Sequence, residues 1–70
     1  MQRRELDAQA LAEDEDWYGN NASFKCPACG GTFIVSGHLN RNGRECPRCG
    51  KATAYVRGGS ASGGSAWIEW

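Results

Sequence analysis

The chain has 70 residues, with eight basic side chains, eight acidic side chains and four cysteines, and its net charge is zero. A chain of this length forms at most one domain, and it buries too little surface to fold securely without a staple such as a metal or a disulfide. No segment has the length of a membrane span, and the first residues lack the apolar run of a signal peptide. We therefore expect a cytoplasmic protein with reduced cysteines.

The first segment, residues 1–22, is predicted to be an acidic arm. Two arginines against six carboxylates give residues 1–18 a net charge of −4. The helix formers of this segment predict a short N-terminal helix. The helix is expected to be marginal, because its apolar face is thin and the acidic run from Glu13 to Asp16 lies at the negative end of the helix dipole. We expect that run to be solvated rather than to form a docking surface.

Trp17 and Tyr18 end this arm and precede a Gly-Asn-Asn sequence that is typical of a turn. Two adjacent aromatic rings gain much by burial, and so we expect both of them to pack on the module that follows.

All four cysteines lie in two copies of Cys-Pro-x-Cys-Gly. Two residues between the cysteines of a pair let a tight turn aim both sulfurs at one point, and sixteen residues between the pairs are enough for a strand, a turn and a return. Four thiolates in a closed tetrahedron are the ligand set of a structural zinc site. We predict one structural Zn²⁺, bound by Cys26, Cys29, Cys46 and Cys49.

The residues around these cysteines predict short strands. Thr32 to Val35 alternates apolar faces, Asn42-Gly43 favours a hairpin turn, and residues 52–57 are expected to form the closing strand. His38 is the single histidine, and since four cysteines already complete a tetrahedral site, we expect it to be a surface turn residue.

The paired cysteine motifs, each followed by a β-type run, resemble the two knuckles of a zinc ribbon over residues 23–57. This resemblance implies a small metal-stapled β fold with about three short antiparallel strands. Zinc ribbons serve many processes, so the resemblance implies a fold and a metal but no single activity. The same motif is also similar to rubredoxin, in which four thiolates hold iron, although the two pairs lie closer together here. Iron-based electron transfer is therefore a third interpretation.

Residues 58–66 have the composition of a flexible Gly/Ser linker, and residues 67–70 form an aromatic tail. The linker resembles an engineered spacer, and one interpretation of the tail is a remnant of the same engineering. The two other interpretations of the tail are a segment that folds back on the ribbon and a short motif that binds a partner.

No catalytic constellation is visible, because no cysteine is left over as a nucleophile and a closed four-cysteine site leaves no position for water. We therefore predict a non-enzymatic adaptor or small subunit of a larger assembly, with no membrane and no small-molecule substrate. Its predicted partner-binding anchors are Trp67, Ile68 and Trp70. The alternative is weak, salt-sensitive nucleic-acid binding, because residues 24–57 carry a net charge of +5. The residues predicted for that alternative are Arg41, Arg44, Arg48, Lys51 and Tyr55.

Overall fold

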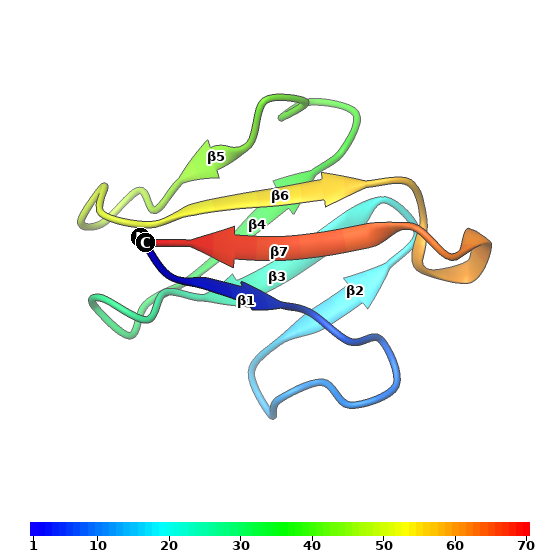
Figure 1. Ribbon diagram of the computed structural model, residues 1–70, viewed down its shortest axis with the longest axis horizontal. Helices are drawn as coiled ribbons and strands as arrows, with labels where there is room; N and C mark the ends of the chain where they lie inside the picture. Colours follow the sequence, from blue (N-terminus) through cyan, green and yellow to red (C-terminus); the bar gives the residue numbers. More distant parts are fainter.

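The computed structural model describes residues 1–70 and contains seven β-strands in two antiparallel sheets, with no α-helix (Figure 1). The elements are β1 (Arg3–Glu5), β2 (Asp16–Tyr18), β3 (Asn21–Lys25), β4 (Thr32–Ser36), β5 (Arg44–Glu45), β6 (Thr53–Arg57), η1 (a 3-10 turn, Ser60–Ser62) and β7 (Ser65–Glu69). One sheet has the order β1-β7-β6-β5 and the other has the order β2-β3-β4. The predicted small β fold is confirmed, with β4 and β6 at the predicted strands. The chain contains no helix long and apolar enough to cross a membrane.

The two sheets lie face to face around one core, with β6 and β7 in front of β3 and β4 in Figure 1. Alternate residues of each strand point inward, as the two-residue period of a strand requires. Phe24 lies opposite Phe33 in the register of β3 and β4, and their ring centroids are 6.3 Å apart. Val56 and Ile68 complete the centre of the core from the other sheet, and neither is more than 1% exposed.

The prediction of an N-terminal helix is wrong. Residues Arg3–Glu5 form the edge strand β1 and pair with β7, so that Arg4 lies opposite Ile68. The N–H of Leu6 then donates to the carbonyl of Ala66 at 2.8 Å, and the Leu6 side chain enters the core. Pairing with β7 satisfies the backbone and buries Leu6, whereas an isolated helix with a thin apolar face would gain little from packing.

The acidic run is not solvated throughout. Glu15 is buried, and its carboxylate accepts two hydrogen bonds from the Arg4 guanidinium, at 3.0 and 2.7 Å, and one from the N–H of Lys25, at 3.2 Å. Burial acts to raise the pKa of Glu15, but the Arg4 guanidinium and the Lys25 N–H outweigh it and hold the pKa below its ordinary value. Glu15 therefore stays ionised inside the fold, while Glu13, Asp14 and Asp16 are exposed as expected.

The two aromatic residues of the arm behave differently. Trp17 is buried in the core, as expected, and its indole Nε1 has no hydrogen-bond partner. Tyr18 is 83% exposed, so the expectation that it packs on the module is wrong. Both lie on β2, where consecutive side chains point to opposite faces, and hence only one of them reaches the core.

The Gly/Ser-rich segment does not form an open spacer. It turns the chain from β6 into β7 through η1, and the N–H of Ser60 donates to the carbonyl of Gly19 at 3.0 Å. A side chain at Gly64 would collide with the carbonyl oxygen of Arg57 and would place its Cβ 2.6 Å from the carbonyl carbon of Gly58. Glycine is required here by close packing.

The aromatic tail folds back, which is one of the interpretations left open above. It forms most of β7, which lies between β1 and β6 in the four-stranded sheet. The two ends of the chain meet there, because the backbones of Gln2 and Trp70 exchange two hydrogen bonds (Figure 1).

Candidate metal centre

The four cysteines meet at one end of the molecule. Cys26 and Cys29 lie in the turn between β3 and β4, and Cys46 and Cys49 lie in the turn between β5 and β6. Their four Sγ atoms lie within 4.8 Å of one another. The structure thus brings together every residue predicted to be a metal ligand.

Each cysteine pair is shaped by the same backbone turn. The N–H of Gly30 donates to the carbonyl of Cys26 at 2.8 Å, and the N–H of Gly50 donates to the carbonyl of Cys46 at 2.8 Å. Both glycines have positive φ, 79° and 68° respectively, which a residue with a side chain rarely adopts. The repeated Cys-Pro-x-Cys-Gly motif therefore encodes two equivalent sulfur-presenting turns.

The sulfur separations fit a single tetrahedral ion. Cys26 Sγ lies 3.6 Å from Cys49 Sγ, and Cys29 Sγ lies 3.6 Å from Cys46 Sγ, so each of these short contacts joins the two turns. A zinc ion with Zn–S bonds of about 2.3 Å separates its thiolates by about 3.8 Å. A disulfide requires an S–S distance of about 2.05 Å, and all four cysteines are free. The cluster is suited to binding one metal ion through four thiolates.

The thiols of the cluster differ in their pKa values. The N–H of Gly31 favours the Cys29 thiolate, but loss of hydration and contacts with the other three sulfurs outweigh it and raise the pKa of Cys29 to about 11. For Cys46, loss of hydration opposes ionisation, yet the N–H groups of Cys49 and Arg48 and two neighbouring sulfurs lower its pKa to about 6. Four thiolates without a cation repel one another, so a metal ion must displace protons to bind them all.

No protein-family model matches this chain, and no curated protein or solved structure matches it either. The four-cysteine cluster is a candidate metal centre on its own geometry.

The predicted partner-binding anchors fall into different environments. Ile68 is fully buried in the core, so it is not available to a partner. Trp67 is partly exposed on the outer face of the four-stranded sheet, and Trp70 is partly buried against the core.

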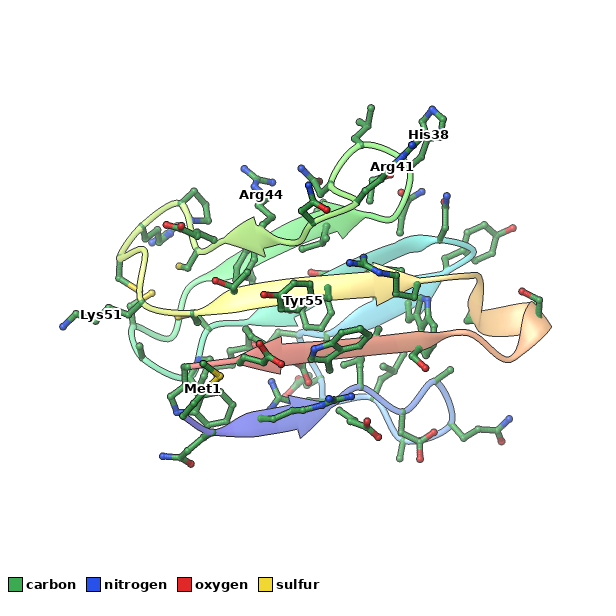
Figure 2. The ribbon with its side chains drawn as sticks, turned by 45° about the horizontal axis from the view of Figure 1, so that its top comes forward. Met1, His38, Arg41, Arg44, Lys51 and Tyr55 are labelled. Atoms are coloured by element: carbon green, nitrogen blue, oxygen red, sulfur yellow. The ribbon has the colours of Figure 1, made fainter.

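The residues predicted to bind nucleic acid do not gather in one patch. Figure 2 shows Arg41 and Lys51 at opposite ends of the molecule, with Tyr55 between them on β6. The Arg44 guanidinium donates to the carbonyl of Ile34 at 2.8 Å, where it covers part of the edge of β4. His38 is exposed in the turn that also carries Arg41, as expected for a surface residue.

One cluster was not predicted from the sequence. It consists of Tyr55, Trp67 and Arg3, and we call it the aromatic face. Tyr55 and Trp67 are opposite one another in the register of β6 and β7, and their rings stack with centroids 5.1 Å apart at 18°. The Arg3 guanidinium lies over the Trp67 ring at 4.7 Å from its centroid. The two-residue alternation of residues 65–69 would have placed Trp67 on this face if the tail had been interpreted as a strand.

Proposed function

We propose that this chain is a non-catalytic, zinc-stabilised module that binds another protein through the aromatic face. The metal part of the proposal is supported by the four thiolates, which suit zinc and complete its tetrahedron without a vacant position for substrate or water. Zinc holds the two cysteine turns together, and the rest of the chain builds the binding surface. The same ligands accept iron in rubredoxin-like sites, so the identity of the metal is part of what is proposed.

The observation that carries the binding proposal is the stacked Tyr55 and Trp67 pair in the middle of a solvent-facing sheet. Tyrosine, tryptophan and arginine dominate the energy of protein interfaces, and stacked rings lose little conformational entropy when a partner covers them.

The charges around the aromatic face favour a protein partner. Arg3 lies over Trp67. The Glu5 carboxylate, on the same strand as Arg3, pairs with its guanidinium at 2.8 Å. The Glu69 carboxylate, on the same strand as Trp67, accepts a hydrogen bond from the indole N–H at 3.2 Å. The Arg57 guanidinium also lies over both rings, so the face carries two arginines and two carboxylates. Charges of both signs complement a mixed protein surface, whereas the two carboxylates offset the attraction of the two arginines for a phosphate backbone.

Affinity capture from the cells of origin tests this proposal, with Trp67→Thr as the variant. Threonine keeps the β propensity of β7 and removes the ring. We expect proteins retained by the wild-type chain to be lost with Trp67→Thr and to stay bound after nuclease treatment.

Ile34→Thr is the matched control, because Ile34 is 60% exposed on the other sheet, β2-β3-β4, and its removal leaves the aromatic face intact. Partners that disappear with nuclease would instead favour nucleic-acid binding. Partners retained equally by all three chains would rule out the aromatic face as the binding surface.

A further inference from the structure

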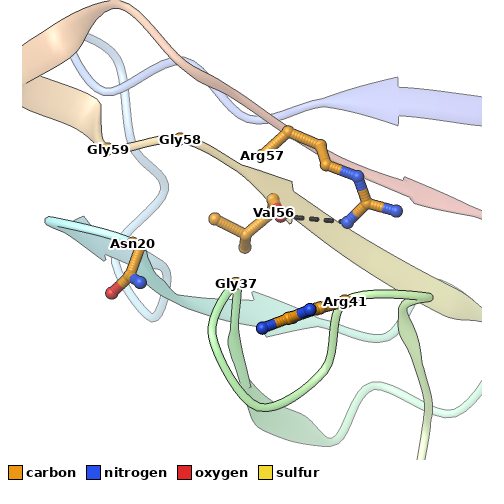
Figure 3. Close-up of a pocket in the computed structure, with 7 residues that line it drawn as sticks. All are labelled: Asn20, Gly37, Arg41, Val56, Arg57, Gly58 and Gly59. Carbon is orange, nitrogen blue, oxygen red and sulfur yellow. Dashed lines mark hydrogen bonds between the residues drawn. The ribbon is translucent and has the colours of Figure 1, made fainter.

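A hollow lies at the end of the molecule that is opposite to the metal centre. Its volume is about 470 Å³, and its lining includes two arginines, one asparagine and three glycines (Figure 3). The hollow forms where the start of β3, the turn after β4 and the end of β6 meet. The cysteine pairs lie elsewhere, after the last residue of β3 and after the last residue of β5. The hollow is therefore separate from the cysteine cluster, and it borders the aromatic face at Arg57, whose guanidinium lies over the rings of Tyr55 and Trp67.

The charge of the hollow is positive and uncompensated. Arg41 and Arg57 both line it, and no carboxylate does. The ion pairs of the structure join other cations, namely Arg3, Arg4 and Lys25, to acidic side chains. Two unpaired guanidinium groups beside one concavity raise the local concentration of anions.

The segment that carries Arg41 is held in place by tight packing. The N–H of Gly37 donates to the carbonyl of Asn20 at 2.7 Å. A Cβ at Gly37 would lie 3.2 Å from the carbonyl oxygen of Val56 and 3.3 Å from that of Asn20, so glycine permits this turn to dock against β3 and β6. Arg41 therefore projects from a docked turn rather than from an open loop.

Arg57 is supported as well. Its guanidinium donates to the carbonyl of Val56 at 3.1 Å and lies over the ring of Tyr55 at 5.7 Å from the centroid. A guanidinium that stacks on a ring and makes one hydrogen bond retains further N–H donors for a ligand. Two arginines on supported backbone segments need less reorganisation to bind an anion than two mobile surface side chains.

We propose that this hollow binds the phosphate group of a small phosphate ester. The planar forks of two arginines match phosphate oxygens, and the asparagine amide supplies a further donor. The volume falls within the range of small-molecule sites and exceeds what inorganic phosphate alone would fill. The phosphate is bound at Arg41 and Arg57, and the remainder of the ester occupies the space over the glycines. This inference does not depend on the partner proposed above.

Amide NMR of the metal-loaded full chain tests the site, with inorganic phosphate and adenosine 5′-monophosphate as separate probes at constant ionic strength. We expect saturable shifts at Gly37, Gly58 and Gly59 with both probes and tighter binding of the ester. Arg41→Gln and Arg57→Gln should each lower the affinity for the ester by about tenfold, as expected for loss of a charged hydrogen-bond donor. Arg41→Lys should lower the affinity for the ester by less, because lysine keeps the positive charge.

Arg48→Gln is the control, since Arg48 is exposed beside the second cysteine pair and its loss changes the net charge by the same amount. Unchanged affinity in this control supports the proposal. The site would be overturned by shifts that rise linearly without saturation, by equal losses in all three glutamine variants, or by saturable binding of phosphate that the ester does not share. A dispersed spectrum in each variant verifies that the chain is folded.

Discussion

Glu15 and Arg4 form a bidentate ion pair that links the N-terminal segment to β3, the strand that leads into the first cysteine turn. The two bonds measure 3.0 and 2.7 Å, and the same carboxylate accepts the N–H of Lys25, the residue before Cys26. The Glu15 side chain is 2% exposed and that of Arg4 is 41% exposed, so the carboxylate depends on this pair while the guanidinium keeps contact with water.

Replacing Glu15 with alanine should therefore destabilise the metal-loaded fold by about 1–2 kcal/mol, an estimate reduced because Arg4 is partly hydrated. Urea unfolding followed by tryptophan fluorescence measures this change. The control Glu13→Ala removes an exposed carboxylate from the same segment and should change the free energy of unfolding by less than about 0.5 kcal/mol. Equal effects of the two variants would mean that the ion pair contributes nothing specific.

Trp17 contributes to stability through its ring and not through its indole N–H. Because Nε1 is buried without a partner, Trp17→Phe removes an unsatisfied donor along with some packing. We expect Trp17→Phe to cost no more than about 1.5 kcal/mol, whereas Trp17→Ala should cost about 3–5 kcal/mol. Thermal unfolding of the two variants compares them, and a Phe variant as unstable as the Ala variant would mean that a phenyl ring cannot replace the indole in the core.

Gly64 is predicted to be intolerant of a side chain. Gly64→Ala places a methyl group against the backbone of Arg57 and Gly58, which cannot move without disturbing the link from β6 to β7. We expect a loss of about 1–3 kcal/mol by analogy with overpacked cores. Ala61→Ser, at an exposed position of η1, is the control and should be nearly neutral. If Gly64→Ala left the free energy of unfolding unchanged, this segment would behave as a flexible spacer rather than as a packed turn.

The affinity of the cysteine cluster for metal should increase with pH. The pKa of Cys29 is raised to about 11, so this thiol is protonated at neutral pH in the metal-free cluster and its proton must be displaced by the metal. Competition with a chelator of known affinity at pH 6.5 and pH 7.5, after correction for the chelator's own titration, should show tighter binding at the higher pH. An affinity independent of pH would mean that the thiols are already ionised.

The parts of the molecule that could be predicted are those determined by local spacing. The Cys-x-x-Cys pairs and the alternating residues of β4 and β6 follow from turn geometry and strand period within a few residues. The role of the tail did not follow from local spacing, because β7 is flanked by β1 and β6 and the register that joins Arg4 to Ile68 links opposite ends of the chain. A helix over Arg3–Glu5 would not pair with β7, so the prediction of a helix leaves no basis for expecting the burial of Glu15 or the aromatic face.

We propose that one metal ion, bound by the four cysteines, holds this fold together. The most direct test of this proposal is a zinc titration of the metal-free chain, followed by amide NMR. We expect a poorly dispersed spectrum without metal. A dispersed spectrum should replace it in proportion to the added zinc and be complete at one equivalent, with no such change in Cys26→Ser. A dispersed spectrum before any metal is added would mean that the fold does not depend on the metal.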